Sequence, residues 1–326
     1  MLRAFIRRRP VVSYYGLALT IVCLVIVWQV GFTLWRAGAG DPFDYSKVLF
    51  GGLTDFGHGR PYANIISIAW VAATREPALF GIFVFATAPT VSAIVTSWLG
   101  WGVEGLKTLF ARLKLWPTRA FRRDALTGYA VIAIVFYLMA QMHLALIDKI
   151  EGHAEMLKAL TPFGMPAILF PLTFLIGGLI DDGATDEELG WRGFALPSLL
   201  AKLPPLAAAL ILGVIWWFWH FPREVPGLAL GGLSWGFVEG QAEFLALVVA
   251  MTVVMTYFFH RTGSIVPAIL LHGWGNFLTK DLGLGTSYFF DDRGWLFVGS
   301  AICLVLVTGP RLGRDRYLAL TGTAPA

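Results

Sequence analysis

Charged residues are scarce in this 326-residue sequence. Only 14% of the residues are charged whereas 57% are hydrophobic, and the mean hydropathy is +0.68. Soluble domains carry about 25% charged residues. The 21 acidic and 25 basic residues are too few to cover the surface of a water-soluble globule of this size, whereas a lipid-facing surface needs none. The composition therefore predicts a polytopic membrane protein.

Several chemical motifs are also absent. The two cysteines, Cys23 and Cys303, lie far apart in separate apolar runs, which excludes a disulfide framework and a thiolate metal cluster. No glycine-rich phosphate loop precedes a helix. The serines near the spans, such as Ser92 and Ser97, lack the Gly-x-Ser-x-Gly context of a nucleophile and have no evident partner. We therefore expect neither nucleotide binding nor nucleophilic catalysis by these serines.

Apolar runs long enough to cross a bilayer are frequent. A spanning helix needs about 20 apolar residues, and this signal predicts an all-α bundle of about eight transmembrane helices. The first follows a basic stretch and is expected to be a retained anchor rather than a cleaved signal. The predicted spans are 11–35, 79–102, 126–147, 164–182, 204–222, 241–260, 264–280 and 292–309.

The basic residues predict the orientation. Lys and Arg concentrate in cytoplasmic loops, and most of the 25 bases fall on the side of the two termini when alternate loops are placed on opposite sides. Both termini are therefore expected to be cytoplasmic, in the plasma membrane if the protein is bacterial. The net charge of +4 then reflects topology, and no nucleic-acid partner is expected.

Two connecting segments are expected to contact lipid headgroups. Residues 65–73 form a short apolar piece that suits an interfacial or re-entrant helix. Residues 104–123 contain an amphipathic pattern with bases on its polar side, as in helices that lie on anionic lipid; a solvated basic loop explains the same pattern equally well.

Three polar clusters occur inside or beside the spans, where ionisable groups are costly and usually functional. They are Thr185-Asp186-Glu187-Glu188-Leu189-Gly190-Trp191-Arg192, Trp216-Trp217-Phe218-Trp219-His220-Phe221-Pro222 and His272-Gly273-Trp274-Gly275-Asn276. Each has a structural explanation: a capping box with a helical ion pair, an interfacial aromatic belt, and interhelical hydrogen bonds.

The structural explanations leave Glu187 without a role. A carboxylate can take a proton from water, imidazole can orient that water, and histidine with asparagine can donate hydrogen bonds to a developing oxyanion. A carboxylate, two imidazoles and an amide are thus sufficient for hydrolysis.

In this order on successive apolar segments, Glu-Glu-x-x-x-Arg, aromatic-x-x-x-His and His-x-x-x-Asn resemble the motifs of the CPBP family of intramembrane endopeptidases. That family includes the type II CAAX prenyl proteases and bacteriocin-processing relatives. The resemblance covers about Pro171 to Leu278. It implies an endopeptidase whose partners are membrane lipids and a membrane-tethered peptide or lipidated protein C-terminus.

The resemblance also implies roles for individual residues. Glu187 would activate the attacking water with His220, and His272 and Asn276 would form the oxyanion hole. No cofactor and no metal are implied. On this basis we divide the chain into N-terminal helices with a basic cytoplasmic loop (1–163), a catalytic core (164–310) and a cytoplasmic tail (311–326).

The resemblance further implies that Glu188 and Arg192 support the site. The sequence departs from the family pattern at two places. Trp216 stands where phenylalanine is common, and the stretch 181–186 is unusually acidic.

Other functions remain possible from the residues alone. Glu187, His220 and His272 offer ligands for a catalytic zinc, although no His-Glu-x-x-His helix is present. Intramembrane acids and histidines also suit the proton relay of a transporter, to which His143 and Gln141 in the third span would contribute. A non-catalytic scaffold that binds membrane peptides would keep the same residues.

Overall fold

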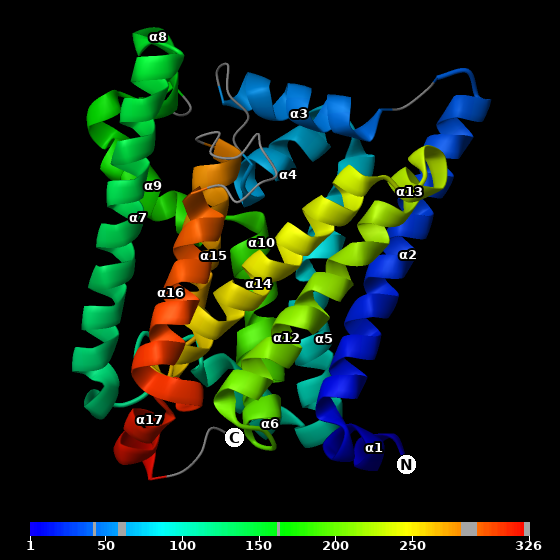
Figure 1. The fold of residues 1–326 in the computed structure, drawn as a ribbon. Helices are drawn as coiled ribbons and strands as arrows, with labels where there is room; N and C mark the ends of the chain where they lie inside the picture. The colour runs from blue at the N-terminus through cyan, green and yellow to red at the C-terminus, as the bar shows by residue number, and fades with distance from the viewer. Residues whose placement is uncertain (42–43, 58–62, 162–163, 282–291, 323–326) are drawn as a thin grey trace.

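The computed structural model describes residues 1–41, 44–57, 63–161, 164–281 and 292–322. These residues form helices and no strand (Figure 1), which confirms the predicted all-α class. The main helices are α1 (Leu2–Arg8), α2 (Pro10–Gly38), α3 (Tyr45–Phe56), α4 (Ile65–Thr74), α5 (Gly81–Trp101), α6 (Val103–Ala111), α7 (Arg122–Ile150), α8 (His153–Leu160), α9 (Phe170–Leu179), α10 (Asp182–Gly190), α11 (Leu196–Leu200), α12 (Pro205–His220), α13 (Val225–Gly231), α14 (Trp235–Thr262), α15 (Val266–Asn276), α16 (Asp292–Thr308) and α17 (Arg314–Thr321).

Seven helical stretches among the described residues are long and apolar enough to cross a membrane. They correspond to seven of the eight predicted spans. The exception is the segment predicted at 264–280, where α15 has only 11 residues and continues into a π-helical turn, Phe277–Asp281. This segment is shorter than a spanning helix needs to be, and it packs against α9, α10, α14 and α7 inside the bundle.

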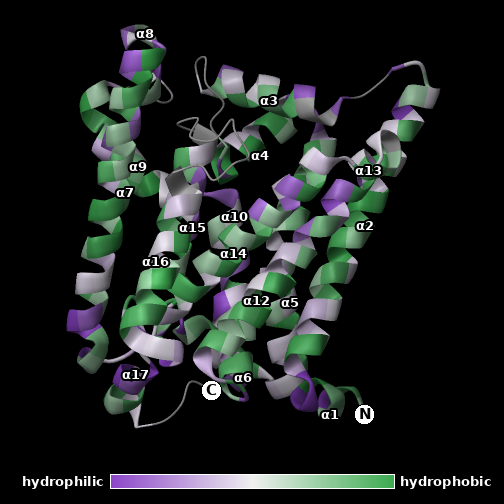
Figure 2. Ribbon diagram, in the orientation of Figure 1, coloured by the Kyte–Doolittle hydropathy of each residue, from purple (hydrophilic) through white to green (hydrophobic). Residues whose placement is uncertain are grey.

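The N-terminus lies at the same end of the bundle as α1, α6 and the last described helix, α17 (Figure 1). Helices α3, α4, α8 and α13 lie at the opposite end. The long helices are mostly hydrophobic along their length (Figure 2). The chain therefore crosses between two polar ends, as an integral multi-pass membrane protein does.

The fourth span differs from its prediction. It was expected at 164–182 with the first polar cluster after it, but the helical stretch runs from Ala167 to Leu200 and is broken between α9 and α10. A π-helix, Trp191–Ala195, follows α10. The acidic cluster ended the apolar run in the sequence, yet it lies inside the bundle. Irregular backbone and polar groups are tolerated at membrane depth where protein buries them.

The break also corrects the predicted helix start. Asp181 is the N-cap of α10, where its Oδ1 accepts a hydrogen bond from the Ala184 N–H at 2.7 Å. Thr185, expected to form a capping box with Glu188, lies inside α10 and donates its hydroxyl to the Leu179 carbonyl at 2.6 Å. The capping box is wrong because the helix begins earlier, at the acidic residues.

The fifth span is longer than predicted. Helix α12 continues through a short 3-10 turn, Phe221–Glu224, into α13, and the whole stretch runs from Pro205 to Ala229. His220 therefore lies well inside a span instead of at its end.

Close helix contacts position the clusters relative to one another. A Cβ on Gly273 of α15 would lie 1.9 Å from the Gly178 carbonyl oxygen of α9, and one on Gly190 of α10 would lie 2.5 Å from the Pro89 carbonyl oxygen of α5. Any side chain at these positions would force the helices apart. Small residues let membrane helices approach this closely.

The shorter segments add detail at both ends. Helix α4 confirms that residues 65–73 are helical. In the 104–123 segment, Leu109 is buried and Arg112 Nη1 donates to the Gly193 carbonyl of the π-helix at 2.5 Å. Burial lowers the pKa of Arg112 to about 10, so it is still charged at neutral pH. This arginine anchors the segment to the bundle, whereas it was expected to lie among the solvated or lipid-facing bases.

Candidate active site

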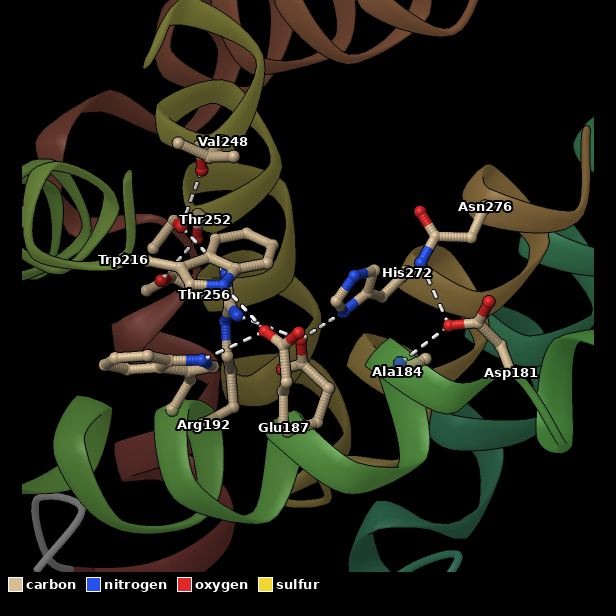
Figure 3. A network of polar contacts seen from close by, with 12 residues as sticks. Asp181, Ala184, Glu187, Arg192, Trp216, Val248, Thr252, Thr256, His272 and Asn276 are labelled. Carbon is tan, nitrogen blue, oxygen red and sulfur yellow. Dashed lines mark hydrogen bonds and ion pairs between the residues drawn. The ribbon is translucent and has the colours of Figure 1, made fainter. Parts of the chain in front are cut away.

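Glu187 lies on α10 near the centre of the bundle and is 4% exposed. Its Oε2 accepts hydrogen bonds from two indoles, Trp216 Nε1 at 2.8 Å and Trp191 Nε1 at 3.2 Å. The carboxylate and the Trp216 indole face each other in Figure 3. Two donors on one oxygen stabilise the charged form and fix the orientation of the carboxylate.

Glu188 and Arg192 form a fully buried ion pair, with both side chains at 0% exposure and a distance of 2.9 Å between Nη1 and Oε1. The predicted helical pair is therefore present. Arg192 Nη2 also donates to Thr252 Oγ1 at 2.8 Å, and its guanidinium lies 4.2 Å from the centre of the Trp216 ring. These contacts join α10, α12 and α14 around one buried charge pair.

His272 joins the same carboxylate. Its Nδ1 lies 2.9 Å from Glu188 Oε1, and because a carboxylate only accepts, this nitrogen donates. The imidazole packs edge-on against Trp216, with ring centres 5.1 Å apart. Glu188 therefore fixes both Arg192 and His272, which explains how it supports the neighbouring Glu187.

Asn276 lies one helical turn after His272 on α15. Its Nδ2 donates to Asp181 Oδ1 at 2.9 Å, the same oxygen that caps α10 (Figure 3). Asp181, which belongs to the acidic stretch that departs from the family pattern, thus has a structural role. It joins the start of α10 to the end of α15.

Gly183 separates two of the candidate groups. A Cβ on this residue would lie 3.2 Å from Asn276 Nδ2 and 3.4 Å from Glu187 Oε1. The oxygen of Glu187 that accepts from no indole therefore borders the same space as the Asn276 amide and Asp181 Oδ1, which would also lie 3.4 Å from the Cβ. Across the described residues, Glu187 Oε1 has no hydrogen-bond partner.

His220 is 8% exposed and lies beside this network on α12. Its Nδ1 donates to the Trp216 carbonyl at 3.0 Å, and its ring packs against Trp219 and Phe244, with ring centres 4.7 and 5.0 Å away. Trp216 connects His220 to Glu187, because its backbone accepts from the first and its indole donates to the second.

The structure thus brings together all six residues singled out in the sequence. Reasoning from the sequence missed the indole donors Trp191 and Trp216, the helix cap Asp181 and the arginine acceptor Thr252. Trp191 lies four residues after Glu187, a helical spacing that places the two on one face. Thr252 lies in an apolar run without a distinguishing pattern, so no sequence signal identified it.

The alternative of a zinc site receives no geometric support. In the described ranges of the chain, no group of three or more His, Cys, Asp and Glu side chains is arranged to hold a metal ion.

The site defines a class of protein: a helical membrane protein with a buried glutamate, histidine and asparagine cluster at a broken span. Residues 163–278 match the family model described as Type II CAAX prenyl endopeptidase Rce1-like. The chain is also 27% identical over 190 residues to CAAX prenyl protease 2 of Methanococcus maripaludis, a match that covers 55% of this chain and 67% of the relative.

The matched region contains all three motifs and ends two residues beyond Asn276. Residues 163–278 of this chain therefore form a domain of the CPBP family of intramembrane endopeptidases, which confirms the resemblance found in the motifs.

Proposed function

We propose that this protein is an intramembrane endopeptidase that cleaves a membrane-tethered or lipidated peptide, with Glu187 and His220 activating water and His272 and Asn276 forming the oxyanion hole. The observation that carries the proposal is the geometry around Gly183. Here the oxygen of Glu187 that accepts from no indole and the amide of Asn276 border one space, where a water and a peptide carbonyl would meet.

Glu187 has the environment of a general base. The two indoles hold Oε2 and leave Oε1 toward Gly183, so the base is oriented before the substrate arrives. A base must lie within hydrogen-bond reach of the proton that it takes. A water on Oε1 would also lie beside the Asn276 amide.

His220 can orient the same water. Its Nδ1 donates to a backbone carbonyl, and that contact selects the neutral tautomer whose Nε2 is an acceptor. A nitrogen in this state accepts a hydrogen bond from water. Trp216 sets the relative position of His220 and Glu187, because it contacts both.

His272 would stabilise the oxyanion as an imidazolium. Its Nδ1 is committed to Glu188, so only a protonated ring has a second N–H to donate from Nε2. Two carboxylates, Glu187 and Glu188, then balance the charges of Arg192 and His272. When Glu187 takes the proton of water and the oxyanion forms, the net charge of the cluster does not change.

Asn276 would contribute the second donor. Its amide is fixed by Asp181, so its position is set before the reaction. Preorganised donors cost no reorganisation when charge develops, and each contributes about 2.7–4 kcal/mol to the transition state.

The substrate class follows from the location of the site. A peptide reaches a site enclosed by spans only if its backbone already lies near the bilayer, and the relative's name, CAAX prenyl protease 2, supports a lipidated C-terminus. We propose that the site opens toward the cytoplasmic half, with both termini cytoplasmic. We also propose that the chain divides into N-terminal helices (1–163), a catalytic core (164–310) and a cytoplasmic tail (311–326).

A comparison of anchored and unanchored substrates tests this function. Purified protein in lipid vesicles would be given one peptide sequence in two forms, with and without a C-terminal lipid, and cleavage would be followed by mass spectrometry. We expect the lipidated form to be cleaved and the free form to be cleaved far more slowly. Equal rates would contradict a membrane-tethered substrate, and Glu187→Gln protein controls for contaminating proteases.

A further inference from the structure

A second cluster of charged side chains lies away from the site, around a cavity of about 460 Å³. Its lining residues are Arg123, Asp124, Thr127, Arg261 and Arg316. They come from the start of α7, the end of α14 and α17. In Figure 1, α17 and these helix ends lie at the same end of the bundle as the N-terminus.

The cavity has an excess of positive charge. Asp124 Oδ2 accepts from Arg316 Nε at 2.8 Å and lies 3.5 Å from Arg261 Nη2. Within the described part of the chain, Arg123 has neither an ion pair nor a side-chain hydrogen bond. One carboxylate cannot neutralise three guanidinium groups, so the cavity suits an anion.

The helix that carries Arg316, α17, is held in place before any ligand binds. Tyr317, next to Arg316, stacks on Phe259 with ring centres 6.1 Å apart and contacts Phe121 at 5.6 Å. His260 Nδ1 also donates to the Leu312 carbonyl at 2.9 Å, which fixes the turn before α17. Preorganisation of this kind lowers the entropic cost of binding.

We propose that this cavity binds the phosphate group of an anionic lipid headgroup. Arginine matches phosphate through paired N–H donors, and the volume lies within the roughly 300–1,000 Å³ typical of ligand pockets. The cavity also lies at the ends of three helices of the bundle, the level at which basic pockets between membrane helices bind lipid headgroups. This proposal is independent of the peptidase activity.

Lipid binding is measured best with the full-length protein in a non-ionic detergent, where no charged bilayer attracts the protein as a whole. Native mass spectrometry with added phosphatidylglycerol or phosphatidylcholine would give a dissociation constant for each lipid. We expect preferential binding of phosphatidylglycerol. Arg123→Gln should weaken it about tenfold or more, as expected for a lost hydrogen bond to a charged group.

Matched variants separate this site from general charge effects. Arg119→Gln makes the same charge change four residues earlier, outside the cavity, and should leave binding unchanged. Arg261→Gln gives a second test within the cavity, since this arginine contacts Asp124 only at 3.5 Å. It should also weaken the binding of phosphatidylglycerol. Equal affinity for both lipids, or an equal loss in the Arg119 variant, would overturn the proposal. Displacement of the lipid by equimolar inorganic phosphate would show that free phosphate is the ligand.

Discussion

Two arginine–carboxylate pairs in this protein have the same four-residue spacing but opposite environments. Glu188 and Arg192 are both 0% exposed, whereas Arg311 and Asp315 are 69% and 65% exposed. The buried pair also fixes His272 and Thr252; the exposed one involves no further described residue. Because the two pairs share one spacing, we expect their surroundings to decide how much each contributes to stability.

The largest expected effect is the loss of protein stability when the buried pair is broken. Glu188→Gln leaves the Arg192 charge without its carboxylate, and removing one partner of a buried pair costs about 3–5 kcal/mol. We therefore expect a lower yield and a clearly lower unfolding temperature in detergent. Asp315→Asn is the matched control and should cost at most about 1 kcal/mol, as for exposed pairs. Similar losses in both variants would remove the distinction that burial makes.

A second variant changes the buried network but leaves the ion pair between Glu188 and Arg192 intact. Asn276→Ala removes the proposed oxyanion donor, so the turnover rate should fall by the equivalent of about 2.7–4 kcal/mol. The Glu188–Arg192 pair stays intact, and the yield should remain much closer to wild type than that of Glu188→Gln. Wild-type turnover of the Asn276 variant would show that this amide only joins α15 to α10.

Gly183 provides a smaller and more local test. An alanine methyl would lie 3.2 Å from Asn276 Nδ2, so this amide would have to shift by a few tenths of an ångström, and it would lie against Glu187 Oε1 at 3.4 Å. We expect a roughly tenfold lower turnover rate, below the 100-fold that a displacement of about 1 Å costs. Gly227→Ala is the control, because a Cβ there meets nothing within 4 Å. Unchanged activity of Gly183→Ala would place the reacting groups elsewhere.

Removal of divalent metal should have no effect. If water is activated by Glu187 and His220, prolonged treatment with a strong chelator leaves the cleavage rate of the purified protein unchanged. A zinc protease of known chelator sensitivity serves as the positive control. Loss of activity that added zinc restores would favour the metal-dependent alternative.

The sequence predicted the helical class and most of the spans because long apolar runs are unambiguous in a bilayer. It placed the fourth span wrongly, because hydropathy treats Asp181 and its acidic neighbours as the end of a helix. In the structure Asp181 faces protein partners, because it caps α10 and accepts a hydrogen bond from Asn276. A hydropathy scan has no information about such partners.

The residues of the candidate site were easier to predict from the sequence than the neighbouring residues that hold them in place. The spacing of Glu188 and Arg192 within one helix was enough to predict their contact. By contrast, the hydrogen bond from Trp216 to Glu187 joins residues 29 positions apart, and the one from Arg192 to Thr252 joins residues 60 apart. Such contacts depend on how helices pack, as do the close approaches at Gly273 and Gly190.

The central claim is that Glu187 is the base of a membrane endopeptidase, and Glu187→Gln tests it most directly. The amide keeps the size of the side chain and an acceptor for the indoles, but it cannot take a proton from water. The measurement is the cleavage rate of a lipidated peptide by purified wild-type and variant protein at equal, folded concentrations. We predict an unchanged yield and unfolding temperature with no detectable turnover. Cleavage by the variant at the wild-type rate would contradict the claim.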